Sequence, residues 1–232
     1  MTNDVPTIRL MSWNINKLSG ARQGGPRSSA AVAGIKKVIG DFFAQETSAI
    51  LALQELSADN DPAGDFMGWL GSLAGCGVSA GSENRCCRTV VVCKGVRAEL
   101  AACNHSLSRA NRYVALTLDA GGRRLRLLAL HANAGGGGGE IADDDIVARL
   151  CECGTWVDEA PLVLAGDTNA APGYRERLTR DLGLADAFAD KATTIWGTSP
   201  DTVMGRDVTM DDAGVHRCGW SDHYPITCAV RL

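Results

Sequence analysis

The chain has 232 residues, 45% of them hydrophobic and 22% charged, and its formal net charge is −4. This length and composition allow a full hydrophobic core, and they predict one α/β domain over residues 1–232. The negative net charge excludes a strongly basic nucleic-acid coat, so any polyanion would have to be held locally.

The amino-terminal segment has no basic head followed by an apolar stretch, and no apolar run approaches the roughly 18 residues of a membrane span. We therefore expect a soluble protein made without a cleaved signal. The nine cysteines are an odd number and lack the spacing of a disulfide framework. Because free thiols persist in reducing compartments, we expect an intracellular protein, cytoplasmic or nuclear.

Short aliphatic and β-branched runs predict buried strands at residues 8–13, 50–53, 90–93, 113–118, 125–130, 162–164 and 226–230. The spacing of apolar residues predicts helices at residues 30–44 and 144–157. Strand and helix alternate early, and two later strands flank the turn-like Asp119-Ala120-Gly121-Gly122. This order predicts mixed β-sheets, and the strands are numerous enough for two packed sheets.

Polar clusters follow the apolar runs, in the order Trp13-Asn14-Ile15-Asn16, Gln54-Glu55, His131-Ala132-Asn133, Gly166-Asp167-Thr168-Asn169 and Ser221-Asp222-His223. Carboxylates, amides and imidazoles gathered at the ends of buried strands are hard to explain by packing alone. We therefore expect these clusters to meet in one active site.

Glu55 comes directly after a buried strand and is well placed to bind a hard divalent cation through oxygen, although a helix or loop cap is the alternative. Asn14 and Asn16 are two residues apart, as are Asp167 and Asn169. On an extended strand each pair shares one face, where its polar groups can fix a carboxylate, a water molecule or a phosphate. A turn is the structural alternative for both pairs.

His131 closes a predicted strand, and His223 stands beside Asp222 just before the last strand. Asp222 and a second carboxylate, Asp207, could set the tautomer and basicity of His223, which makes His223 the candidate general base. A serine nucleophile is disfavoured, because the chain has no Gly-x-Ser-x-Gly elbow and Ser221 adjoins His223.

Two further motifs are not expected to bind a ligand. Cys86-Cys87 and Cys151-x-Cys153 lack the two-residue spacer of common Zn²⁺ sites, so we expect buried free thiols. The glycine run at residues 135–139 is not a phosphate loop, because no Gly-Lys-Ser/Thr follows it. We expect it to be a mobile loop beside His131.

The ordered set of polar clusters resembles the exonuclease/endonuclease/phosphatase superfamily, which includes pancreatic-type deoxyribonucleases and abasic-site endonucleases. The resemblance runs from about Ile8 to Leu232. Thr194-Ile195-Trp196 and the adjacent Arg206-Asp207 resemble a further family region, in which one residue separates the arginine from the aspartate. The resemblance implies a four-layer α/β sandwich with two packed mixed β-sheets flanked by helices.

The resemblance also implies a Mg²⁺-dependent phosphodiesterase, with Mn²⁺ as an alternative cation. Glu55 would be the principal metal ligand, with Asn14 and Asn16 lining the metal and phosphate pocket. Asp167 would orient or deprotonate the attacking water, and Asn169 would hold a phosphate oxygen.

The histidines complete this implied catalytic set. His223, beside Asp222 and backed by Asp207, would contact the scissile phosphate and help to activate the nucleophile. A histidine at position 131 resembles the deoxyribonuclease and phosphodiesterase branches of the family. It implies that His131 stabilises the leaving group or binds phosphate.

The substrate is indicated by a basic central stretch that contains Arg85, Arg88, Arg109, Arg112, Arg123, Arg124 and Arg126. This stretch could hold a nucleic-acid backbone or form a solvated strand edge. Trp196 could stack on a base or pack in the core. We predict a DNA endonuclease, with DNA as partner and with Arg109, Arg112 and Trp196 binding the substrate.

Two alternatives to the endonuclease stay open. The enzymatic alternative is a phosphodiesterase or phosphatase that acts on a protein–DNA adduct, a phospholipid or an inositol phosphate. The non-enzymatic alternative is a catalytically silent nucleic-acid-binding module, against which the intact Glu55, Asp167 and His223 argue.

Overall fold

The computed structural model describes residues 6–21, 27–61, 64–81, 87–133, 140–158, 160–170 and 172–232. The glycine run at residues 135–139, Arg85 and Cys86 lie outside these ranges. Among the described helices, none is long and apolar enough to cross a membrane. All described cysteines are free; of those predicted to be buried thiols, Cys87 and Cys153 are buried, whereas Cys151 is exposed.

The strands form two six-stranded sheets. The first sheet has the order β11 (Thr209–Val215), β12 (Ile226–Arg231), β1 (Thr7–Asn14), β2 (Ala49–Leu56), β4 (Arg88–Lys94) and β3 (Cys76–Ala80). The second has the order β5 (Arg97–Leu100), β6 (Tyr113–Ala120), β7 (Arg123–His131), β8 (Leu162–Asp167), β10 (Asp201–Arg206) and β9 (Ala185–Asp186). Every strand predicted from the sequence is present.

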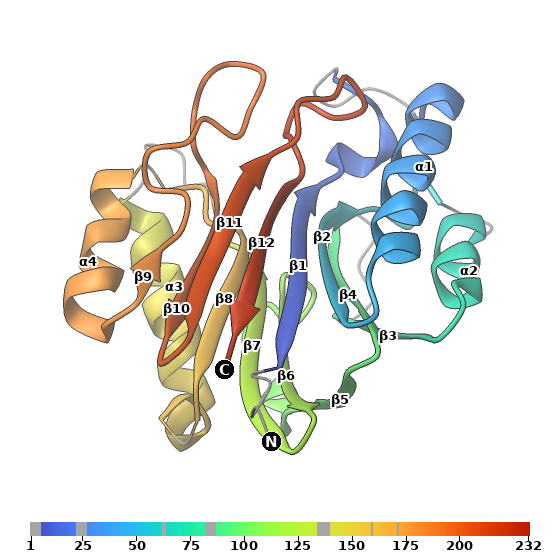
Figure 1. Ribbon diagram of the computed structural model, residues 1–232. Helices are drawn as coiled ribbons and strands as arrows, with labels where there is room; N and C mark the ends of the chain where they lie inside the picture. Colours follow the sequence, from blue (N-terminus) through green and yellow to red (C-terminus); the bar gives the residue numbers. More distant parts are fainter. Residues whose placement is uncertain are drawn as a thin grey trace.

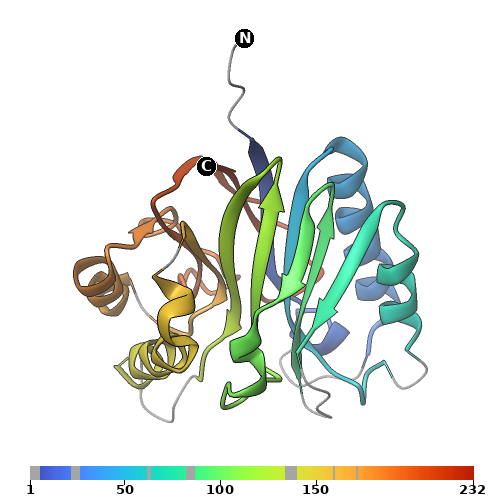
Figure 2. The ribbon, with the colours of Figure 1, turned by 90° about the horizontal axis from the view of Figure 1, so that it is seen from below.

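The helices cover the outer faces of the two sheets (Figure 1). On one side lie α1 (Ser29–Gln45) and α2 (Asp65–Ser72), and on the other lie α3 (Glu140–Cys153) and α4 (Pro172–Leu182). Figure 2 shows the same order of layers from below. Short 3₁₀ helices occupy Asn16–Leu18, Ala102–His105 and Gly154–Val157. The four-layer α/β sandwich is thus confirmed.

Alternate residues of the central strands enter different cores. Ile8, Leu10 and Ile50 pack between the two sheets, whereas Met11 and Leu51 pack against the first pair of helices. A third core joins the second sheet to α3 and α4. Strands buried on both faces read as nearly continuous apolar runs, and this is why the sequence revealed them.

Each sheet has one parallel pair at its centre, β1 with β2 and β7 with β8. The carboxyl ends of a parallel pair lie at one edge, which brings Asn14 beside Gln54 and His131 beside Asp167. β10 is antiparallel to β8, so its first residue, Asp201, also pairs with Asp167. Strand ends from both sheets therefore meet at one edge of the sandwich.

Candidate active site

A cavity of about 330 Å³ lies where these strand ends meet. Its lining residues are mostly charged or amide-bearing: Asn16, Lys17, Glu55, Arg112, His131, Asn133, Asp167, Asn169, Asp222 and His223. The predicted clusters thus converge, with Asn14 buried at the base between two of their carboxylates.

Glu55 reaches the cavity because β2 is irregular at its end. The register of β2 against β4 shifts between Leu53 and Leu56, and Glu55 has a left-handed φ of 58°. A non-glycine residue rarely adopts this conformation outside functional or turn positions. Because of this irregularity, the Glu55 side chain is not buried like the other residues of β2 and is 21% exposed.

Asn14 links the carboxylates of the two sheets. Its Nδ2 donates to Glu55 Oε1 at 3.1 Å and to Asp167 Oδ2 at 2.9 Å, while its Oδ1 accepts from the backbone N–H of Asn16 at 2.9 Å. The amide therefore turns its NH₂ group, not its oxygen, toward the carboxylates. This geometry does not support Asn14 as the predicted metal ligand and makes it a bridge instead.

The pairs Asn14/Asn16 and Asp167/Asn169 were predicted to share a strand face, but they lie in turns. β1 ends at Asn14 and β8 ends at Asp167. The backbone N–H of Asn169 donates to Asp167 Oδ1 at 2.9 Å, just as that of Asn16 donates to Asn14. Both i+2 asparagines have left-handed φ, 42° for Asn16 and 50° for Asn169. The Asn16 Nδ2 donates to the Gly20 carbonyl, so the geometry does not favour Asn16 as a metal ligand either.

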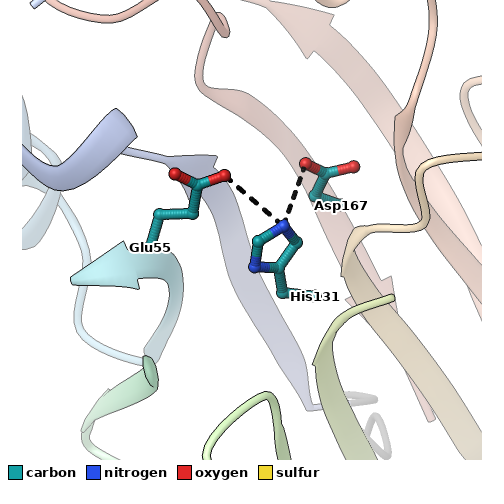
Figure 3. A group of neighbouring side chains, drawn as sticks. All are labelled: Glu55, His131 and Asp167. Atoms are coloured by element: carbon teal, nitrogen blue, oxygen red, sulfur yellow. Dashed lines mark ion pairs between the residues drawn. The ribbon is translucent and has the colours of Figure 1, made fainter. Parts of the chain in front are cut away.

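His131 lies between the two acidic residues, with Nε2 at 3.4 Å from Glu55 Oε1 and 3.8 Å from Asp167 Oδ2 (Figure 3). Burial lowers the pKa of His131 from 6.5 to about 4; Asp167 opposes this shift, and the charges of Arg112, His223 and Lys17 reinforce it. His131 is therefore neutral at pH 7. Its buried Nδ1 has no hydrogen-bond partner among the described residues.

His223 has the opposite protonation. Its Nδ1 lies 2.8 Å from Asp201 Oδ2, and its Nε2 lies 3.9 Å from Asp167 Oδ2. Burial alone would lower the pKa of His223, but the charges of Asp201 and Asp167 and the hydrogen bond to Asp201 raise it from 6.5 to about 10. The carboxylate that contacts His223 is therefore Asp201, the first residue of β10, which was not predicted from the sequence.

The prediction that Asp207 backs His223 is wrong. Asp201 is the first residue of β10, and Asp207 directly follows its last residue, so the two lie about 20 Å apart at roughly 3.3 Å per residue. The Asp207 side chain is 74% exposed, and its nearest ion-pair partner is Arg206. Thr193, the residue directly before the predicted motif Thr194-Ile195-Trp196, contacts this carboxylate, because its Oγ1 donates to Asp201 Oδ2 at 2.7 Å.

Asp222 lies at the cavity, whereas Trp196 does not. Asp222 lines the cavity, and burial raises its pKa, while the neighbouring His223 and Ser221 oppose the shift. The Ile195 N–H donates to the Asp222 carbonyl at 2.9 Å, which ties the two loops together. Trp196 is 55% exposed and is not among the residues that line the cavity.

The basic stretch does not form one track. Arg112 lines the cavity and donates to the carbonyls of His131 and Ala132, whereas Arg109 lies 3.6 Å from Asp145. Arg123 begins β7, and His131 ends it, so the two lie about 26 Å apart at roughly 3.3 Å per residue. Arg126 is buried against Trp156.

The donor set fits a hard divalent cation. Glu55, His131 and Asp167 each offer one ligand atom, and these atoms lie within 4.8 Å of one another. Carboxylate oxygens are the donors that Mg²⁺ prefers, and a neutral histidine does not repel a cation. Glu55 is therefore the main residue that would hold the metal, with Asp167 close beside it.

Sequence reasoning missed two residues of this site, Asp201 and Lys17. Most of the predicted clusters follow an apolar run, whereas Asp201 precedes one, Thr202-Val203-Met204. A carboxylate that opens an antiparallel strand reaches the same edge as one that closes its partner, so this signal could have found it. Lys17 directly follows a cluster and carried no separate signal.

No family model matches the sequence, and no curated protein matches it significantly. Solved structures do. TDP2 of D. rerio, complexed with a single-strand DNA product, is 17% identical, with 97% of this chain and 99% of that chain covered and a TM-score of 0.68. The human Nocturnin catalytic domain with a bound sulfate anion is 20% identical, with coverage of 97% and 93% and a TM-score of 0.65.

A bacterial protein gives the same result. The endonuclease/exonuclease/phosphatase protein of Beutenbergia cavernae DSM 12333 is 15% identical, with 98% of this chain and 72% of that chain covered and a TM-score of 0.62. At these identities the comparisons show a shared fold.

Proposed function

We propose that this chain, which has the endonuclease/exonuclease/phosphatase fold, is a metal-dependent phosphodiester hydrolase. The observation that carries the proposal is the convergence of Glu55, Asp167, His131 and His223 in one cavity at the strand ends of both sheets. A carboxylate that can hold a cation, a second that can orient water, a neutral histidine and a protonated histidine suit the hydrolysis of a phosphate ester.

The divalent cation, when bound, supplies stabilisation of the negative charge that develops on the phosphate. His223, held at Nδ1 by Asp201, presents its Nε2–H to the cavity and can donate it to a phosphate oxygen. Asp167 has Oδ1 fixed by the Asn169 N–H and Oδ2 fixed by Asn14, so its carboxylate is oriented to hold the attacking water. Holding the water in position before the reaction lowers the activation barrier for hydrolysis.

His131 and Asn169 would contact the phosphate or the leaving group. His131 is neutral, and its Nε2 faces the two carboxylates, so it can donate a hydrogen bond without adding charge. Asn169 Nδ2 donates to the Ala132 carbonyl at 2.8 Å. An amide NH₂ has a second hydrogen, which suits a phosphate oxygen.

For the substrate we propose a DNA strand cleaved internally. Support comes from Arg112 in the cavity wall and from the structural likeness to TDP2 of D. rerio, which was solved with a single-strand DNA product. The competing proposal is a small or protein-linked phosphate ester. The dispersal of the arginines favours that alternative, because only Arg112 of the described basic stretch lines the cavity.

The test compares Glu55→Gln with a matched surface variant, Glu99→Gln, whose carboxylate is 61% exposed and away from the cavity. Cleavage of plasmid, single-stranded DNA, RNA and a chromogenic phosphodiester is measured with Mg²⁺ and with excess EDTA. Because removal of a metal ligand removes transition-state stabilisation, Glu55→Gln should lose at least about 100-fold in turnover, and Glu99→Gln should lose none. Full turnover in EDTA would contradict the metal mechanism.

A further inference from the structure

The chain turns sharply between β1 and α1, beside Glu55. Asn16, Lys17 and Leu18 follow one another with left-handed φ values of 42°, 54° and 62°. Non-glycine residues adopt this conformation singly and at a cost, because the Cβ atom crowds the carbonyl oxygen. Three in succession mark a strained segment, and strain of this kind persists where the surrounding structure imposes it.

The surrounding structure fixes this turn. Leu18 and Ile15 are fully buried, and the Leu18 N–H donates to the Ile15 carbonyl at 2.9 Å. Ser19 donates to the Asn16 carbonyl from both its N–H and its Oγ, at 2.9 and 2.6 Å. The Lys17 carbonyl accepts from Asn60. The backbone of Lys17 is thus held on both sides, with its side chain at the cavity.

The Lys17 side chain is the part of the turn that faces the catalytic residues. It lines the same cavity as Glu55, Asp167 and His223. Among the described residues, no carboxylate forms an ion pair with the Lys17 ammonium. A cation held at a polar cavity without an anionic partner is suited to an anionic ligand.

We infer that Lys17 is a phosphate-binding residue of this site: its ammonium contacts a non-bridging oxygen of the phosphate group held between the two sheets. The inference rests on the proposed function and adds a substrate contact to it. Lys17 and Arg112 both line the cavity, and two cationic side chains there favour phosphate over neutral esters.

The test titrates the full chain with inorganic phosphate in the presence of Mg²⁺ by calorimetry. Loss of one charge-assisted hydrogen bond should weaken phosphate binding about tenfold or more in Lys17→Met, whereas Lys17→Arg should stay within about threefold of the parent. Lys37→Met is the control, because Lys37 is exposed on α1 and pairs with Asp41. It should bind phosphate as the parent does.

Lys17→Gly separates a binding role from a structural one. Glycine adopts left-handed φ without strain, so this variant should melt at a higher temperature than the parent and yet lose phosphate affinity as Lys17→Met does. Unchanged phosphate affinity in Lys17→Met or Lys17→Gly would overturn the inference. Weakened phosphate binding together with metal-independent turnover would instead refute the proposed function and leave the role of Lys17 intact.

Discussion

At the scale of single residues, two histidines share one cavity and carry different charges. Burial removes the water that would stabilise protonated His131, and nearby cationic groups disfavour its protonation further, so its pKa is about 4. His223 is also buried, but Asp201 and Asp167 outweigh the loss of water, and its pKa is about 10. Opposite shifts in neighbouring titratable groups are typical of sites that divide acid and base roles.

Asp201→Asn tests whether Asp201 sets the charge of His223. Without the Asp201 charge, the pKa of His223 should fall from about 10 toward its ordinary value of 6.5, which NMR titration of the imidazole in metal-free protein measures. A raised histidine pKa stabilises the fold fully below pH 6.5, and this contribution is lost as the pH rises through 10. The variant should therefore lose stability at pH 6 and show little further loss between pH 8 and 10.

Turnover gives a second readout for the same substitution. Because the imidazole loses both its orientation and its proton, Asp201→Asn should lower turnover by about 100-fold or more. Asp207→Asn, at the other end of β10, should leave turnover and the His223 titration unchanged. If Asp207→Asn were the damaging variant, the assignment from the structure would fail and the one from the sequence would return.

Site residues could be predicted from the sequence where a polar residue closes a buried strand. Glu55, His131 and Asp167 belong to clusters of this kind, and they line the cavity together with His223, which precedes its strand. Asp201 was missed because it opens its strand, and its distance from His223 in the sequence hides their contact. Long-range pairing of an antiparallel strand decides such contacts, and one local motif cannot reveal it.

At the scale of elements, the sequence predicted seven inner strands and missed the four edge strands, β11, β3, β5 and β9, together with the inner strand β10. β3, β5 and β11 are largely unburied and carry few consecutive apolar residues, because an edge strand has one partner and faces water. α2 and α4 were missed as well, since both are short. A strand that is buried on both faces has a nearly continuous apolar run that can be recognised in the sequence, whereas an edge strand has none.

Two glycines in α1 give a matched test of how this helix supports the site. A Cβ at Gly34 would lie 2.2 Å from the Trp220 ring, whereas a Cβ at Gly40 would meet no atom within 4 Å. Gly40→Ala should therefore stabilise the protein by up to about 1 kcal/mol through helix propensity. Gly34→Ala should destabilise it, because the indole ring must move.

Trp220 precedes Ser221-Asp222-His223, so a displaced ring should also disturb the catalytic segment. Thermal melts and turnover measured on both variants check this prediction. Gly34→Ala should lower both quantities, and Gly40→Ala should keep turnover. Equal stabilisation by the two alanines would show that Trp220 does not depend on contact with α1.

At the scale of the whole molecule, the site exists only when the sheets are packed together. The first sheet supplies Asn14 and Glu55, and the second supplies His131, Asp167 and Asp201. Asn14 joins the two sets through hydrogen bonds to Glu55 and Asp167. Folding and assembly of the catalytic groups are thus one event, and both parallel strand pairs point their carboxyl ends at it.

The distribution of charge over the molecule predicts how salt affects substrate binding. The net charge is −4, and of the described basic stretch Arg112 is at the cavity while Arg123 and Arg124 lie near the far end of β7. For a single strand, each phosphate contact contributes about −0.7 to the slope of log affinity against log salt. Binding of single-stranded DNA to Glu55→Gln, measured across a salt series, should therefore show a shallow slope.

Variants of the two arginine groups test this distribution. Arg112→Gln should reduce the magnitude of the slope by about 0.7, the value of one contact, while Arg123→Gln with Arg124→Gln should leave it unchanged. If the distant pair flattens the slope, the DNA strand runs along the whole of β7. If DNA does not bind even at low salt while a small phosphodiester is still cleaved by the parent, the substrate is the smaller ester, since a single pocket with few cations holds one phosphate better than a strand.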